Sequence, residues 1–228
     1  DGKGEKMAKS KGNVIYPEEV IKQYGAEILR LWVASENYRE DMRISPDILK
    51  RLSEAYRKVR NTCRFLLGNL SDFDPAVHSV PYENLAELDR WALHQLQALA
   101  SRVLNAYRAY EFHTVYHSIS NFCINDMSAV YLDILKDRLY CSAAADPSRR
   151  AAQTVLNIVL ESLLRLCAPI LCFTADEAWK YLPQKAGLQE SVHLSCFPAL
   201  PQEYTNPMIA ERWGILLQVR DRVLKSLE

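Results

Sequence analysis

The sequence predicts a mainly α-helical protein built as a bundle of long helices. Apolar residues recur at spacings of three and four over several long segments, which is the period of a helix that buries one face. Prolines precede several of these segments, and proline suits the first position of a helix. Apolar residues make up 49% and charged residues 25% of the 228 residues, a balance typical of a globular domain with a real core.

Proline marks the starts of the first two predicted helices. Pro17 is followed by two glutamates, which favour a first helical turn, and Gly25 interrupts the apolar stripe that follows. Residues 35–44 are polar and irregular. Ser45-Pro46-Asp47 then begins a longer helix, whose apolar stripe lasts until the turn-rich connector at 69–75.

Three further long helices and a last amphipathic segment follow. The periodicity predicts helices at about 85–110, 114–139 and 147–182, and a last one from about 206 to the end. Pro169 should end or kink the helix that contains it. A short strand is possible at 42–44, and 191–197 alternates weakly enough to be a short strand or an extended connector.

Composition limits the classes of partner and site. The formal net charge is zero, so a polyanionic partner must be met by local basic patches. No apolar run reaches membrane-spanning length, and we expect a soluble protein of the cytoplasm with no membrane partner. The six cysteines show no CxxC spacing, so we expect reduced thiols and no metal site in this chain.

Residues 6–13 read KMAKSKGN and follow a glycine-rich start at 2–4. Lys6 and Lys9 flank small residues, and lysine is a compact, mobile point charge that suits a triphosphate. A flexible loop can close such charges over a nucleotide and then release the product. A solvated lysine-rich loop without a ligand is the alternative, and composition alone favours it. The stretch is not a P-loop, because no GxxxxGK[ST] is present.

The order of the residues adds to their composition. KMAKSKGN resembles the KMSKS signature of class I aminoacyl-tRNA synthetases, with Ala8 in place of the usual serine. The stretches that follow, read in order, are most similar to those of the bacterial-type isoleucine-specific enzymes of that class: YGAEILRLWVAS, DMRIS, YRKVRNTCRFLLGNLSDFDP, LDRWALHQL, ADEAWKYLP and SVHLSCFP. The resemblance covers essentially the whole chain.

The resemblance implies an organisation. Residues 1–44 would hold the signature loop and a small segment that contacts the tRNA stem. Residues 45–182 would be the helical-bundle anticodon-binding domain of the class Ia enzymes. Residues 183–228 would be a linker and the start of a C-terminal region. The nucleotide-binding body would lie upstream and a zinc-binding region downstream, so we expect this chain to be inactive alone, to hold no cofactor itself and to be a monomer.

The resemblance also implies roles for loop residues. Lys6 and Lys9 match the two lysines that contact ATP phosphates and stabilise pyrophosphate, and Ser10 matches the signature serine, which also binds ATP. The intact enzyme would use ATP and Mg²⁺ to activate isoleucine and would esterify it to tRNA(Ile). Ala8 lacks the hydroxyl of its counterpart, which we do not expect to abolish activity, because both lysines remain.

Basic residues gather on one face of the helix predicted from residue 45. Lys50, Arg57 and Arg64 are seven apart and Arg60 falls three after Arg57, so the four share a face opposite the apolar stripe. Such a row suits RNA phosphates. The alternative is a solvated face in which Glu54 pairs within the helix. With the resemblance, we expect phosphate contact.

Other chemically capable residues fit structural roles better. His113 and His117 are four apart but lack a third ligand pattern. Asp126 and Asp133 lie in or beside a buried stripe, where bonding within the bundle is expected. The tryptophans at 91, 179 and 213 could stack on anticodon bases, yet each lies within an apolar pattern that favours core packing.

Two other functions stay open from the sequence. One is a related synthetase specific for valine or leucine, which a different anticodon preference would reveal. The other is a helical interaction module with no RNA role, for which RNA binding would be absent or insensitive to salt.

Overall fold

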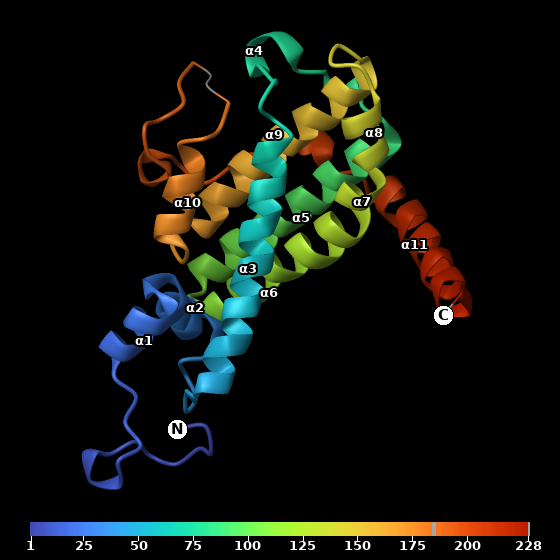
Figure 1. The fold of residues 1–228 in the computed structure, drawn as a ribbon. Helices are drawn as coiled ribbons and strands as arrows, with labels where there is room; N and C mark the ends of the chain where they lie inside the picture. Colours follow the sequence, from blue (N-terminus) through green and yellow to red (C-terminus); the bar gives the residue numbers. More distant parts are fainter. Residues whose placement is uncertain (184–185, 228) are drawn as a thin grey trace.

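A computed structural model describes residues 1–183 and 186–227, and throughout these ranges the regular elements are helices, with no strand among them. Figure 1 shows the helices packed against one another, with α3 running down the front of the body and α11 diverging from it. They follow in the order η1 (Lys9–Lys11), α1 (Pro17–Tyr24), α2 (Ala26–Ser35), α3 (Pro46–Gly68), α4 (Pro75–His78), η2 (Tyr82–Asn84), α5 (Glu87–Arg108), α6 (Phe112–Asn121), η3 (Phe122–Tyr131), α7 (Leu132–Ile134), α8 (Lys136–Cys141), α9 (Pro147–Cys167), α10 (Cys172–Trp179), η4 (Val192–Leu194), η5 (Gln202–Tyr204) and α11 (Pro207–Leu227).

The predicted helix starts have the expected local chemistry. Pro17, Pro46 and Pro147 each stand at the first helical position. The Ser45 hydroxyl accepts a hydrogen bond from the Ile48 amide (3.2 Å), which caps α3. Gly25 has a φ of 89°, a conformation that glycine adopts readily, and it separates α1 from α2.

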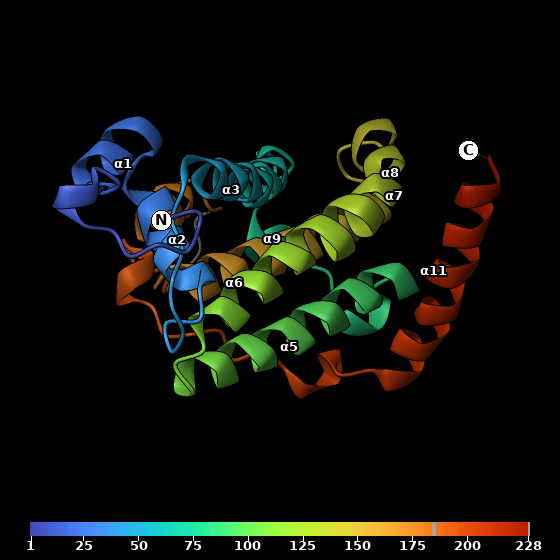
Figure 2. The same cartoon turned by 90° about the horizontal axis from the view of Figure 1, so that it is seen from below.

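The segment predicted as one helix at 114–139 is a succession of helices of several types, which we call the α6–α8 rod. It starts at α6, continues as the π-helix η3 and ends in α7 and α8 (Figure 2). Phe122, Met127 and Tyr131 are almost fully buried, and their spacings of five and four place them on one side of a helix wider than an α-helix. The Ser128 hydroxyl donates to the Cys123 carbonyl five residues earlier (2.8 Å).

The core lies between α5, the α6 and η3 parts of the α6–α8 rod, and α9. Helix α9 is buried along most of its length, because apolar residues cover more than one of its faces. Trp91 and Trp179 are each 1% exposed, so the expected core packing of these tryptophans is confirmed. Trp213 on α11 is half-buried and packs against Trp91, with ring centroids 5.6 Å apart.

Two carboxylates bind segments that are distant in the chain. Asp89 is fully buried, and Arg138 donates to both of its oxygens (3.0 and 2.9 Å) while the Tyr131 hydroxyl donates to Oδ1 (2.8 Å). Asp72, after α3, accepts from Arg149 on α9 (2.6 and 2.9 Å). The Arg149 guanidinium holds the pKa of Asp72 well below its usual range. Asp89 therefore fixes α5 to the α6–α8 rod, and Asp72 fixes the end of α3 to α9.

The short strands considered at 42–44 and 191–197 do not form. Residues 42–44 run without regular structure beside α2, where the Trp32 indole donates to the Arg43 carbonyl (2.9 Å). Residues 192–194 form the turn η4, in which the Ser191 hydroxyl accepts from the His193 amide (3.3 Å). A strand needs a partner strand, and none lies beside either segment in the described chain.

Candidate nucleic-acid interface

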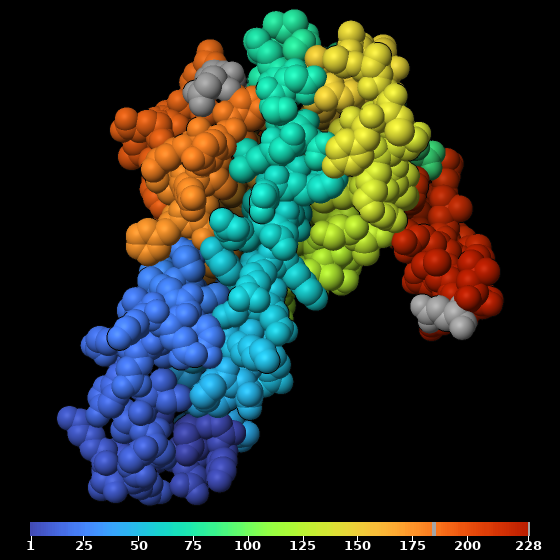
Figure 3. All heavy atoms as spheres, viewed as in Figure 1, coloured from blue at the N-terminus to red at the C-terminus, as the bar shows by residue number. Residues whose placement is uncertain are grey.

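Helix α3 presents the predicted basic face to solvent. Its apolar residues, such as Leu52, Val59 and Leu66, are buried against the bundle, which turns the opposite side outward. Lys50, Arg57, Arg60 and Arg64 are all exposed there. Figure 3 shows the whole length of α3, in cyan and teal, running over the visible surface of the molecule.

The four cations of this basic face form no ion pair or side-chain hydrogen bond within the described residues. The alternative was that Glu54 neutralises the helix by pairing with Lys50 or Lys58, and neither of these ion pairs forms within that part of the chain. Four exposed, unpaired cations on one helix face concentrate positive potential on a chain whose net charge is zero.

The signature loop is shaped by Asn13. Its side-chain oxygen accepts from the Ala8 amide (3.0 Å), and its amide nitrogen donates to Asp1 Oδ2 (3.0 Å) and the Lys6 carbonyl (3.4 Å). Gly12, at a φ of 65°, ends the turn η1 and donates its amide to the Lys9 carbonyl (3.2 Å). Position 8 contributes its backbone here, so the loop keeps this shape with alanine.

Lys6, Lys9 and Ser10 are exposed in this loop, and their side chains make no hydrogen bond or ion pair with described residues. Figure 1 shows the loop at the end of the molecule, beyond the first turn of α3. The structure therefore does not bring the three loop residues and the basic face of α3 into one site. They are two separate surfaces.

Two side chains of α2 attach the loop-bearing segment to the bundle. Glu27 accepts from the Phe173 amide at the start of α10 (2.8 Å), and Arg30 donates to the carbonyls of Ile170 (2.9 Å) and Pro169 (2.8 Å) after α9. Burial raises the pKa of Glu27, although its hydrogen bonds oppose that rise. Neither residue was singled out from the sequence, because their partners lie about 140 positions later.

The remaining candidates have structural surroundings. His113 and His117 lie on α6, and within the described residues no cluster of three or more metal-binding side chains exists. Asp133 is exposed and pairs with Lys136 (2.8 Å). Asp126 is half-buried in η3, and burial raises its pKa to about 6, against the opposing charge of Arg102.

The comparisons define the class of protein. Residues 89–226 match the family described as the anticodon-binding domain of tRNA ligase, and residues 1–45 match the family of class I tRNA synthetases for I, L, M and V. The chain therefore belongs to the anticodon-binding domain family of the tRNA ligases. The predicted helical anticodon-binding fold is confirmed, and a helical module without an RNA role is not favoured.

Two curated relatives of the chain share one name and match it over its whole length. The chain is 58% identical over 228 residues to an isoleucine–tRNA ligase of Geobacter sulfurreducens and 56% identical to that of Carboxydothermus hydrogenoformans, each match covering 100% of this chain. The predicted resemblance is thereby confirmed. The chain spans about a quarter (24%) of the length of these relatives.

A solved structure has the same fold. The LeuRS of Agrobacterium radiobacter K84 (agnB2), in a ternary complex with tRNA and LeuAMS, aligns with a TM-score of 0.66 at 19% identity. The alignment covers 90% of this chain and 23% of that one. No helix in the described part of the chain is long and apolar enough to cross a membrane.

Proposed function

We propose that this chain is the tRNA-holding part of an isoleucine–tRNA ligase and that it binds tRNA(Ile) through the basic face of α3. The observation that carries the proposal is the row of four exposed, unpaired cations on α3, a helix that packs against α6, η3 and α9 of the matched anticodon-binding domain. Phosphates spaced along an RNA backbone are the partners that such a row suits, and their contacts set the register of the RNA on the bundle.

We propose a separate role for each of three parts of the chain. Residues 1–44 carry the signature loop and contact the tRNA stem, residues 45–182 bind the anticodon arm, and residues 183–228 lead into a C-terminal region. The chain acts as a cytoplasmic monomer within a longer enzyme. That enzyme joins isoleucine to tRNA(Ile) with ATP and Mg²⁺, and we expect any zinc of the enzyme to lie outside this chain.

In the longer enzyme, Lys6 and Lys9 hold the phosphates of ATP while the aminoacyl adenylate forms, and Ser10 contributes a hydroxyl to the same phosphates. Charge develops on the departing pyrophosphate, and a positioned ammonium group stabilises it. Removing one such contact should cost about 2–4 kcal/mol at the transition state. The exposed, unbonded side chains of Lys6, Lys9 and Ser10 and the backbone bonds that Asn13 makes within the loop are compatible with this role.

Fluorescence anisotropy of the chain with labelled tRNA(Ile), and with the same tRNA carrying an exchanged anticodon, tests the proposal. We expect tighter binding to the native anticodon and a steep loss of affinity with salt. Equal binding to both RNAs would assign base discrimination to another part of the enzyme. Absence of binding at low salt would refute the proposal that this chain holds tRNA.

A valine- or leucine-specific relative is the second candidate for the enzyme. The isoleucine–tRNA ligases that match over the whole chain make it the weaker one. Binding of the chain to tRNA(Val) or tRNA(Leu) in preference to tRNA(Ile) would favour it.

A further inference from the structure

The turn between α9 and α10 receives two charged side chains from α2. Arg30 donates through Nε to the Ile170 carbonyl (2.9 Å) and through Nη2 to the Pro169 carbonyl (2.8 Å). The Glu27 carboxylate accepts from the Phe173 amide (2.8 Å). The three bonds join positions that are 139 to 146 residues apart in the chain. We call Glu27 and Arg30 together the α2 clamp.

Each charge of the α2 clamp meets a helix end of opposite polarity. The end of α9 carries a partial negative charge and the start of α10 a partial positive charge. The Arg30 guanidinium lies on the turn directly after α9, and the Glu27 carboxylate lies on the first turn of α10. Hydrogen bonds that involve an ionised group are stronger than neutral ones. The α2 clamp is therefore specific for this one turn of the bundle.

Apolar packing holds α2 on the bundle but does not fix its exact position. Ile28, Leu31 and Ala34 are buried, and the hydrophobic effect that favours their burial has no direction. An open cleft of about 420 Å³ lies between α2 and Phe112, with Arg30 in its wall, so the apolar contact is incomplete there. Hydrogen bonds require a donor and an acceptor about 3 Å apart and well aligned. The α2 clamp therefore determines where α2 lies on the bundle.

The same turn is also bonded to α3, the helix with the basic face. The hydroxyls of Tyr56 on α3 and Thr174 on α10 lie 2.9 Å apart and form a hydrogen bond. Tyr56 directly precedes Arg57 of the basic face, and Thr174 directly follows Phe173, whose amide bonds to Glu27. Helix α2 and the basic face are therefore both held to the first turn of α10.

Short, packed elements connect α2 to the signature loop. Gly25 alone separates α2 from α1, and α1 packs against α2. Three residues, 14–16, lie between Asn13 of the loop and the first residue of α1. Figure 1 shows α1 and α2, in blue, between the loop and the bundle. A shift of α2 on the bundle would therefore move the loop relative to the basic face.

We propose that Arg30 and Glu27 are positioning residues for the transfer of isoleucine to tRNA(Ile) in the longer enzyme. In this step a hydroxyl oxygen of the 3′-terminal ribose attacks the carbonyl carbon of the aminoacyl adenylate and forms the ester bond. The bond from that carbon to the phosphate oxygen breaks, AMP leaves with the electron pair, and the hydroxyl proton is released to water.

The α2 clamp acts on this step through distance. It sets the separation between the tRNA phosphates on α3 and the loop at the reaction centre, so that the 3′ end of the bound tRNA meets the adenylate. A misplacement of about 1 Å can slow a reaction about 100-fold. This inference rests on the proposed function, which assigns the tRNA to the basic face and the loop to the reaction centre.

Single-turnover transfer from preformed isoleucyl adenylate to saturating tRNA(Ile), measured in the whole enzyme, tests the inference. We expect Arg30→Ala to slow transfer about 10- to 100-fold. Pyrophosphate exchange without tRNA and the Kd for tRNA(Ile) should stay at their wild-type values, because the loop lysines and the basic face are intact. A general loss of structure would instead change all three quantities.

Arg220→Ala is the matched control. Arg220 also donates to a backbone carbonyl of a distant segment, that of Ala129 (3.1 Å), but it holds α11 and not α2. This variant loses a bond of the same kind and should transfer isoleucine at the wild-type rate.

A pair of variants at Glu27 separates loss of the bond from loss of the fold. Glu27→Ala removes the acceptor of the Phe173 amide and should slow transfer in the same way as Arg30→Ala. Glu27→Gln keeps an acceptor oxygen in the same place and should transfer faster than Glu27→Ala.

Three results would overturn the inference. They are a wild-type transfer rate in Arg30→Ala, a parallel loss of transfer, pyrophosphate exchange and tRNA affinity, and a Glu27→Gln enzyme as slow as Glu27→Ala. Each of them leaves the proposed function in place, provided that the wild-type enzyme binds tRNA(Ile) in a salt-dependent manner. A wild-type enzyme that does not bind tRNA(Ile) would refute the proposed function and the inference with it.

Discussion

Replacing Arg138 with alanine should destabilise the fold through the carboxylate that it leaves behind. Asp89 is fully buried and receives three hydrogen bonds, two from Arg138 (3.0 and 2.9 Å) and one from the Tyr131 hydroxyl (2.8 Å). The variant removes both bonds from the guanidinium and leaves a buried charge with one neutral donor. Breaking a buried ion pair in this way costs about 3–5 kcal/mol.

Urea denaturation followed by circular dichroism measures this loss as a fall in the free energy of unfolding. The matched control is Arg212→Ala, which breaks an ion pair to Glu87 (2.6 Å) whose two side chains are 62% and 41% exposed. That control should cost no more than about 1 kcal/mol. If Arg138→Ala lowers the free energy of unfolding as little as the control does, the ion pair of Asp89 does not hold α5 to the α6–α8 rod.

A second test of the same network removes both charges. The double variant Asp89→Leu with Arg138→Met keeps apolar volume at both positions and leaves no buried charge. It should be more stable than Arg138→Ala alone, because the penalty comes chiefly from the unpaired carboxylate. A double variant less stable than the single one would contradict this reasoning and assign the larger loss to the Tyr131 hydroxyl, which is buried and loses its acceptor when Asp89 becomes leucine.

Three further predictions concern charge and the attachment of the loop segment. Because burial raises the pKa of Asp126 to about 6, the folded state binds this proton more tightly than the unfolded state, so stability should fall as pH rises from about 4 to 6. Asp126→Asn should remove this fall and raise the free energy of unfolding at pH 8 by about 1–3 kcal/mol, and an unchanged pH profile would contradict it. Arg30→Ala should cost about 1–3 kcal/mol and increase proteolysis within residues 1–44 more than Lys22→Ala does. Both side chains are exposed, but Arg30 donates to two carbonyls of the bundle, whereas the Lys22 ammonium forms no hydrogen bond or ion pair with the described residues. In the whole enzyme, Lys9→Ala should slow adenylate formation, measured by pyrophosphate exchange, by about 30- to 1,000-fold without changing tRNA affinity.

Local patterns in the sequence predicted what depends on neighbouring residues. Helix α3 was placed within a residue or two at both ends, because a capping serine, a proline and an apolar stripe act over a few positions. The exposure of Arg57 and Arg64 followed from the same period. The π-helix η3 was missed, since a stripe with spacings of five and four resembles an ordinary helical stripe with scatter.

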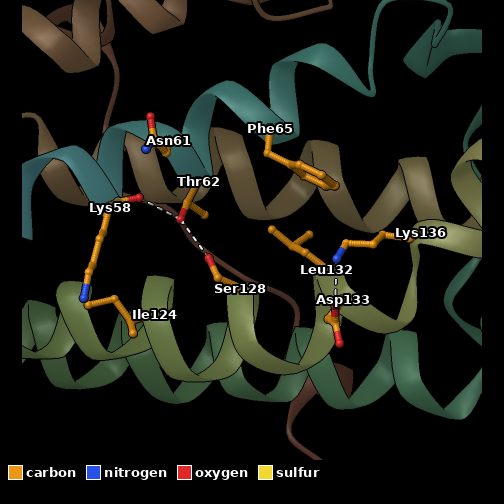
Figure 4. A pocket seen from close by; sticks show the side chains of 9 residues that line it. All are labelled: Lys58, Asn61, Thr62, Phe65, Ile124, Ser128, Leu132, Asp133 and Lys136. Carbon is orange, nitrogen blue, oxygen red and sulfur yellow. Dashed lines mark hydrogen bonds and ion pairs between the residues drawn. The ribbon is translucent and has the colours of Figure 1, made fainter.

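Contacts between distant segments could not be predicted from one sequence. Glu27 and Arg30 are ordinary polar residues of an amphipathic helix until the turn after α9 lies beside them. A pocket of about 430 Å³ between α3 and the η3–α7 segment likewise needs Phe65 and Leu132 to face each other (Figure 4), which depends on how α3 packs on η3 and α7. Asn13 was overlooked beside the lysines of its loop, although asparagine next to glycine is typical of a residue that shapes a turn.

The salt dependence of tRNA binding by a variant with fewer charges on α3 tests most directly whether the basic face binds RNA phosphates. Arg57→Ser with Arg64→Ser is compared with Arg108→Ser with Arg212→Ser, which removes the same charge from α5 and α11, away from α3 (Figure 2). We predict that the α3 variant makes the negative slope of log affinity against log salt shallower by about 1.4–1.8 and that the control leaves the slope unchanged. Equal slopes for the wild type and the α3 variant would contradict the claim that this face binds the phosphates of the tRNA.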